Sequence, residues 1–434
     1  MIRRVRIQGY KSLRDAEIPL EPLTVILGPN AAGKTNLFDA LRLLARIVTG
    51  KNVKEAFDPE EHRGVPLEAF YLLAERDGGG TSSDTARFTI EADVELSPEV
   101  ILAVEDQIAK MREGLREAGA PRRVIEKRLR YSITVEMVLA SGYLRVRDEK
   151  LVALSADGTE RQRRVPFLGL EGERLRLRME GQARPTEHEI GLDYALVSAP
   201  LYPPHYPHIT AFREELSRWR FYYLEPREMR AEVALQELRS LAPSGAGLGA
   251  FFNTLKVENP KQFESIQRTL HTLLPPIDHL DVEHTRRGFL ELRVVEEGVP
   301  FSSRVISEGT LRILGLLAIT NPISPVTVIG YEEPENGVHS HRLALIARML
   351  ATAADRGKQV LINTHSPLLA KHLASAARLV LCKRTDHETR FESYEGGPLF
   401  LAGAAEEALA EEESAKEPPP TDLSERVVRG DFGS

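Results

Sequence analysis

Four residues near the start of the chain have the types and spacing of a phosphate-binding loop. In the stretch LGPNAAGKTN, Gly28, Gly33, Lys34 and Thr35 fit the pattern G-x-x-x-x-G-K-[ST]. The glycines let backbone N–H groups converge on phosphate oxygens, and Lys34 adds a full positive charge. Thr35 can place its hydroxyl on Mg²⁺. Ordinary residue usage would give this pattern by chance in only about one or two of a hundred such chains.

Two carboxylates and a histidine follow apolar stretches later in the chain. VIGYEEPEN places Glu332 and Glu333 at the end of a strand, where Glu332 could hold Mg²⁺ and Glu333 could deprotonate a water molecule. Taken alone, an ordinary acidic loop is an equally good interpretation. His365 in INTHSP could sense a terminal phosphate, and the alternative is a structural histidine. The phosphate loop in the same chain favours the functional interpretation of all three.

A second anion-binding surface is predicted at SEGT, residues 307–310, where Ser307 and Gly309 begin an apolar helix. One nucleotide does not need two such surfaces from a single subunit. The redundancy therefore predicts that the second surface serves the nucleotide of a partner.

The elements around these motifs alternate between strands and helices. LTVILGPN runs as a strand into the loop, and apolar residues recur at helical spacing after Lys34. A buried helix is expected over 307–319, a strand over 326–334, and further apolar strands in QVLINTHSP and ARLVLCKR. Apolar strands separated by helices predict a parallel sheet covered on both faces.

The middle of the chain has a different pattern. Strands expected over 87–96 and 131–140 predict a second sheet, with a charged helical hairpin over 98–130 that breaks at Gly119-Ala120-Pro121. The expected segments are 1–86, the first part of the head; 87–220, a β-rich lobe with the helical arm; 221–400, the second part of the head; and 401–434, an acidic, proline-containing, disordered tail.

Composition excludes several classes of protein. The chain has 434 residues, of which 42% are hydrophobic and 28% charged, with a net charge of −7 and one cysteine, Cys382. These values are typical of a soluble globular protein. No run approaches the ~18 apolar residues of a membrane span, and the first residues lack a signal-peptide core. We therefore expect a cytoplasmic protein without a membrane partner.

The order of the motifs resembles the ATP-binding-cassette (ABC) ATPases of the RecF/SMC/OLD group, and most closely the bacterial AAA-type ATPases related to OLD proteins, without a Toprim domain. The opening IQGYKSLRDAEIPLEPLTVILGPNAAGKTNLFDAL and the segment FYYLEPREMR ahead of SEGT carry the likeness together with EEPENGVH and NTHSP. The resemblance implies an α/β fold, a P-loop NTPase of ABC type with a second β-rich lobe and a short helical-hairpin insertion.

The resemblance also implies roles for individual residues. Glu333 and His365 match the catalytic glutamate and the switch histidine, and Thr35 and Glu332 match the Mg²⁺ ligands. The Walker A loop corresponds to Gly28, Pro29, Asn30, Ala31, Ala32, Gly33, Lys34, Thr35 and Asn36. The signature that engages ATP across a dimer corresponds to Ser307, Glu308, Gly309 and Thr310, and the D-loop to Asn336, Gly337 and His339. Lys11 and Ser12 fall where the group often contacts nucleotide or DNA.

Three features depart from the group. Glu332 stands where many relatives have Asp, Glu308 stands where a transporter-type signature has Gly, and no glutamine can be placed in a Q-loop.

The implied function is a Mg²⁺-dependent ATPase with ATP and Mg²⁺ as cofactors. It would dimerise head to tail around ATP and act as a switch in DNA repair or antiviral defence, with nucleic acid and a separate nuclease or toxin subunit as partners. Arg174, Arg176 and Arg178, on one face of an expected strand, could track a nucleic-acid backbone, although a solvated strand face is the favoured interpretation. The alternatives are the motor subunit of a membrane transporter and a chain with its own nuclease activity.

Overall fold

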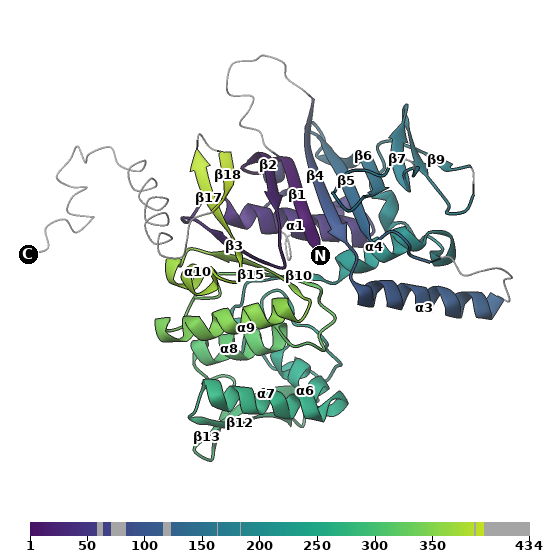
Figure 1. Cartoon of the computed structure of the whole chain (residues 1–434). Coiled ribbons are helices and arrows are strands. Elements are labelled where there is room, and N and C mark those ends of the chain that lie inside the picture. Colours follow the sequence, from purple (N-terminus) through teal and green to yellow (C-terminus); the bar gives the residue numbers. More distant parts are fainter. Residues whose placement is uncertain are drawn as a thin grey trace, which may run out of the picture.

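The computed structural model describes residues 1–58, 64–70, 84–115, 123–162, 164–182, 184–385 and 388–394. The expected tail, 401–434, and the break at 119–121 lie outside these residues. Within them, the chain forms three sheets with helices packed between and below them (Figure 1). No helix of this described part is long and apolar enough to cross a membrane.

The central sheet has six strands. Its order is β10 (Trp219–Tyr222), β15 (Val328–Glu332), β16 (Gln359–Thr364), β3 (Leu23–Leu27), β17 (Arg378–Thr385) and β18 (Glu388–Ser393). Neighbouring strands are parallel except β18, which runs antiparallel to β17. Every residue of β3, β15 and β16 is buried, as expected for strands covered on both faces. The predicted parallel sheet is therefore confirmed.

Helices cover the two faces of this sheet. On one face lie α1 (Lys34–Thr49), α2 (Val53–Ala56) and α4 (Pro207–Ser217), which share one hydrophobic core with part of the sheet. On the other face lie α8 (Glu308–Ile319), α9 (Leu343–Asp355) and α10 (Pro367–Leu373), in a second core (Figure 1). The helix α8 is buried nearly all round, as its apolar sequence predicts.

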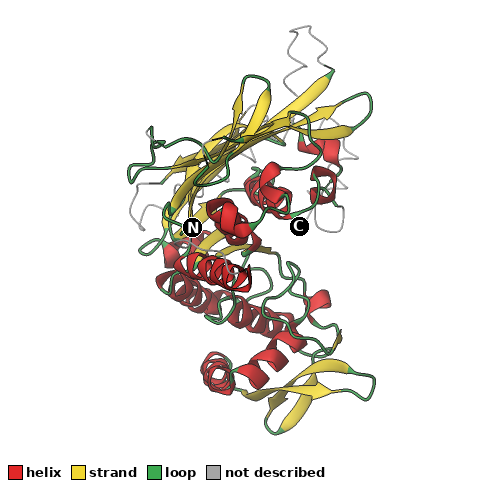
Figure 2. Ribbon diagram, turned by 90° about the vertical axis from the view of Figure 1, so that its right-hand side faces the viewer, coloured by secondary structure: helices red, strands yellow, loops and turns green. Residues whose placement is uncertain are grey.

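A second, antiparallel sheet of eight strands covers α1, α2 and α4 from the other side (Figure 2). Its order is β2 (Leu13–Pro19), β1 (Ile2–Tyr10), β4 (Thr85–Glu95), β5 (Arg128–Val138), β6 (Tyr143–Ala153), β7 (Leu168–Glu171), β8 (Arg174–Leu177) and β9 (Thr186–Glu189). This is the β-rich lobe that the sequence predicts. The strands of the expected first segment, 1–86, are divided between the two sheets, because β1 pairs with β4 whereas β3 lies in the central sheet.

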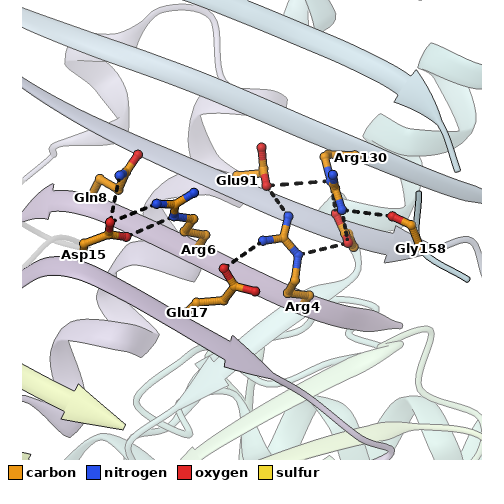
Figure 3. Close-up of polar contacts among 9 residues, drawn as sticks. Arg4, Arg6, Gln8, Asp15, Glu17, Glu91, Arg130 and Gly158 are labelled. Atoms are coloured by element: carbon orange, nitrogen blue, oxygen red, sulfur yellow. Dashed lines mark hydrogen bonds and ion pairs between the residues drawn. The ribbon is translucent and has the colours of Figure 1, made fainter. Parts of the chain in front are cut away.

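The outer face of the eight-stranded sheet carries a ladder of ion pairs (Figure 3). Arg4 on β1 contacts carboxylates on both neighbouring strands, including Asp93 at 3.1 Å. Arg130 on β5 reaches the same Asp93 at 2.6 Å, and Arg6 pairs with Asp15 at 2.9 Å. Cross-strand pairs of opposite charge stabilise a sheet modestly and specify its strand register.

The insertion between β4 and β5 differs from the prediction. Its described part is one helix, α3 (Pro98–Leu115), which packs against α4. Residues 123–127 have no regular structure, and β5 begins at Arg128. The expected second helix of the hairpin is therefore wrong for residues 123–130, and the preceding residues 116–122 lie outside the described residues. Leu129, Tyr131 and Ile133 are buried, alternate with half-buried residues and pair with β4, which overrides the helical appearance of the preceding Arg and Lys residues.

A smaller lobe lies below the second core. After α5 (Pro226–Met229) and β11 (Val233–Ala234), the helices α6 (Leu248–Glu258) and α7 (Pro260–Leu273) pack on a small sheet made with β12 (Ile277–His284), β13 (Phe289–Glu296) and β14 (Val299–Ser302). Figure 2 shows this sheet at the end of the molecule opposite the eight-stranded sheet. Residues 303–307 then lead from β14 into α8, so this lobe positions the SEGT motif.

Candidate active site at the carboxyl edge of the central sheet

The loop between β3 and α1 has the conformation that its glycines permit. Gly33 caps the N-terminus of α1 with a φ of 96°, a backbone region that disfavours any side chain. Lys34 is 5% exposed, and its Nζ donates to the carbonyl oxygens of Gly28 and Pro29 at 2.7 and 2.5 Å. The Lys34 side chain therefore folds back onto its own loop, and the loop lies at the N-terminus of the sixteen-residue helix α1.

Two side chains from elsewhere in the chain, Thr389 on β18 and Ser12 in the turn between β1 and β2, support this loop. The Thr389 hydroxyl on β18 donates to the carbonyl of Ala32 at 2.8 Å and lies 2.6 Å from the hydroxyl of Ser12. Ser12, which is 8% exposed, also accepts from Asn36 at 2.7 Å. A Cβ on Gly33 would overlap the Thr389 hydroxyl. The contacts described for the Ser12 side chain are thus with the loop residue Asn36 and with Thr389. Thr389 is a residue that sequence reasoning missed.

The first carboxylate lies beside the loop threonine. Glu332 ends β15, and its Oε2 accepts a hydrogen bond from Thr35 Oγ1 at 3.3 Å. Asn363, its register partner on β16, has Nδ2 3.5 Å from the same hydroxyl. Arg42 on α1 lies 3.5 Å from Glu332 Oε1. Two strands, β15 and β16, and the helix α1 therefore converge on the position of the Thr35 hydroxyl.

The donors at this position fit a magnesium ion. Mg²⁺ in P-loop proteins takes a loop hydroxyl and one strand-end carboxylate together with phosphate oxygens, and Thr35 and Glu332 supply these two groups. The Oδ1 atom of Asn363 is buried and has no hydrogen-bond partner among the described residues. Sequence reasoning also missed Asn363. In the same described ranges, no cluster of three or more His, Cys, Asp or Glu could hold a metal.

The second carboxylate sits in a strained turn. Glu333 has a φ of 49°, its N–H donates to the Asn363 carbonyl at 2.7 Å, and its side chain accepts from the Asn336 amide. His365 Nδ1 lies 3.6 Å from Glu333 Oε1, across the ends of two neighbouring strands. Left-handed backbone at a non-glycine residue costs free energy and often marks a functional position.

The signature residues lie at the same edge of the sheet but on α8. Ser307 caps this helix by accepting from the Thr310 N–H at 3.2 Å, and the side chains of Ser307 and Glu308 are exposed. Gly309 packs directly against the Gly337 carbonyl, so the start of α8 contacts the expected D-loop. His339, further along that loop, is exposed and has Nδ1 2.8 Å from His341 Nδ1.

The residues considered for nucleic-acid contact do not gather at this site. Lys11 Nζ is 2.7 Å from Asp39 on α1, behind the phosphate loop. Arg174 and Arg176 lie on β8, near the far edge of the eight-stranded sheet, and pair with Glu187 at 3.5 and 3.2 Å. Arg178 follows the same strand.

Two family models of AAA domains match parts of this chain. A family model described as "AAA domain, putative AbiEii toxin, Type IV TA system" matches residues 198–371, and a model described as "AAA ATPase domain" matches residues 1–73. An OLD nuclease from Thermus scotoductus is 43% identical over 44 residues, which is 10% of this chain and 8% of that relative's length.

One solved structure supports the fold independently of sequence. An SMC head bound to the C-winged helix domain of ScpA superposes with a TM-score of 0.54 at 11% identity, covering 91% of this chain and 97% of that one. The SMC head domain from Thermotoga maritima has a TM-score of 0.43 at 12% identity and covers 91% and 99% of the two chains.

Proposed function

We propose that this chain, an ABC-type AAA ATPase of the SMC and OLD kind, hydrolyses ATP with Mg²⁺ at a site completed by a second copy of itself. One observation carries the proposal. The carboxyl ends of β3, β15 and β16 bring together the loop threonine, two glutamates and a histidine, with Thr35 3.3 Å from Glu332 and His365 3.6 Å from Glu333. Ligands of parallel α/β sheets bind at this edge.

Each of these groups has a role in phosphoryl transfer to water. The loop N–H groups and Lys34 hold the phosphates, while Thr35 and Glu332 would hold Mg²⁺, which neutralises charge on the phosphate oxygens when bound. Glu333 is placed to accept the proton of the attacking water, and His365 faces the same space from β16. The strained turn fixes the direction of the Glu333 carboxylate.

The proposed second copy supplies Ser307 to Thr310. The exposed Ser307 and Glu308 side chains lie at the N-terminus of the twelve-residue α8, which can bind an anion from outside the chain. Within one subunit, the start of this helix contacts the D-loop at Gly337. Two copies related by a twofold axis would each complete the other's site.

The proposal is tested with Glu333→Gln. We expect ATP turnover to fall at least about a hundredfold, because the base is lost while the shape is kept. ATP binding should persist, and ATP should trap a dimer that light scattering detects. Glu297→Gln is the matched control, because Glu297 is exposed and has the same φ of 49°. A Glu333→Gln protein that turns over ATP like wild type would refute the assignment of the base.

We further propose that the switch acts on nucleic acid, in DNA repair or antiviral defence, together with a separate nuclease or toxin subunit. The short OLD nuclease match and the toxin-type family description support this role. A gel shift of duplex DNA with and without ATP tests it, and equal absence of binding in both conditions counts against it.

A further inference from the structure

We propose that Glu335 is a positioning residue that sets the orientation and tautomer of His365. It holds the ring so that Nδ1 carries the proton and faces inward, which leaves Nε2 for the nucleotide. The inference rests on the proposed ATPase function for its role in turnover, but the contact itself stands on geometry alone.

The Glu335 carboxylate lies against the carboxyl end of β16. Its Oε1 accepts hydrogen bonds from the Thr364 hydroxyl at 2.5 Å and from the His365 backbone N–H at 3.2 Å. The same oxygen lies 3.4 Å from His365 Nδ1, and the Glu335 side chain is 9% exposed. One oxygen atom therefore contacts both the backbone and the ring of His365.

The two ring nitrogens of His365 have different surroundings. Nδ1 is buried between Glu333 and Glu335, at 3.6 and 3.4 Å, although 39% of the side chain is exposed. A buried nitrogen that faces two carboxylates is stabilised when it bears a proton. Nε2 then lies on the open side without a proton in the neutral ring, able to accept a hydrogen bond. In proteins, the partner of one imidazole nitrogen decides the state of the other.

Glu335 is itself incompletely satisfied. Its Oε2 atom is buried and has no hydrogen-bond partner among the described residues. A buried carboxylate without full hydrogen bonding destabilises a fold, so its presence at the site calls for a compensating N–H donor. The His365 ring is the N–H donor that lies beside this carboxylate, with Nδ1 3.4 Å from its other oxygen, Oε1. Glu333, which lies 3.6 Å from the same Nδ1, strengthens the preference for a proton there.

The tautomer can be measured on nucleotide-free protein labelled with ¹⁵N-histidine. Two-bond ¹H–¹⁵N correlations should show the His365 proton on Nδ1, with the signal assigned by its loss in His365→Gln. Glu335→Met should weaken this preference, whereas Glu335→Gln, which keeps an acceptor oxygen, should retain most of it. A wild-type His365 with its proton on Nε2 overturns the proposal, whether or not the protein hydrolyses ATP.

Turnover gives the second readout. Glu335→Met should lower kcat about tenfold and change KM for ATP less than about twofold, because the ring is misplaced while the phosphate loop is intact. In a His365→Ala background the same substitution should cost less than about twofold, since both changes remove one unit. Equal losses of kcat in the two backgrounds would mean that Glu335 only supports the fold, and would overturn the positioning role. Absence of turnover in wild type would refute the ATPase function instead.

Discussion

Glu149 is a buried carboxyl group in the β-rich lobe, and its protonation makes the free energy of unfolding depend on pH. It is fully buried on β6 and accepts hydrogen bonds from the Leu196 and Val197 N–H groups at 2.7 and 3.1 Å and from the Tyr131 hydroxyl at 2.9 Å. Burial raises its pKa from 4.5 to about 7, although these hydrogen bonds favour the charged form. The group therefore binds a proton more tightly in the folded than in the unfolded chain.

The sign of the effect on stability follows from this difference. Between pH 4.5 and about 7 the folded state holds the proton and the unfolded state does not, so the free energy of unfolding falls as pH rises through this window. The contribution is at most about 3 kcal/mol. Glu149→Gln should flatten the curve of stability against pH, measured by urea unfolding at several pH values, while Glu173→Gln, an exposed control on the same lobe, should not. Parallel curves for Glu149→Gln and wild type would contradict the assignment.

At the scale of elements, the antiparallel edge strand β18 stabilises the phosphate loop. Thr389 is 3% exposed and bonds both Ala32 and Ser12, and its own N–H donates to the Ser12 carbonyl at 2.9 Å. Thr389→Val keeps the shape but leaves the Ala32 carbonyl and the Ser12 hydroxyl without this partner. We expect a loss of about 1–3 kcal/mol in the free energy of unfolding.

The same substitution should weaken ATP binding, since the loop no longer has a fixed support. Titration calorimetry with a non-hydrolysable ATP analogue measures this effect. Thr389→Ser retains the hydroxyl and is the matched control, so it should bind nearly as tightly as wild type. If Val and Ser variants bind equally well, the hydroxyl does not support the loop.

The elements also show what sequence could predict. Lys34, Glu332 and His365 each lie at or just after the end of an apolar strand. Because the carboxyl ends of parallel strands meet at one edge of a sheet, the sequence predicts that these three residues lie close together. Asn363 and Thr389 have no such pattern, because their contacts depend on β16 lying next to β15 and on β18 turning back along β17. The prediction of a helix near Arg128 is wrong for the same reason, because the contacts of this segment are long-range. It pairs with β4, and local propensity does not encode such pairing.

At the scale of the whole molecule, residues as far apart in sequence as Ser12 and Thr389 lie together at the phosphate loop. The signature helix α8, in contrast, packs on the face of the central sheet opposite to α1, the helix that follows this loop. A pair of chains would therefore contain two composite sites, each with the loop of one chain and Ser307 of the other. Two inactive variants can test this arrangement. Lys34→Ala removes the phosphate ligand and Ser307→Arg blocks the signature, so we expect each variant alone to lack ATP turnover.

Mixing these two variants should restore activity. Random exchange makes half of the dimers mixed, and each mixed dimer has one intact site, so about a quarter of the wild-type rate is expected. A mixture of Lys34→Ala with Glu333→Gln is the control. Both changes lie in the half of the site that contains the phosphate loop, so a mixed dimer of these two variants has no intact site. Recovery in the first mixture but not in the second requires that Ser307 acts on the nucleotide of the other subunit, whereas no recovery in either would contradict the shared site.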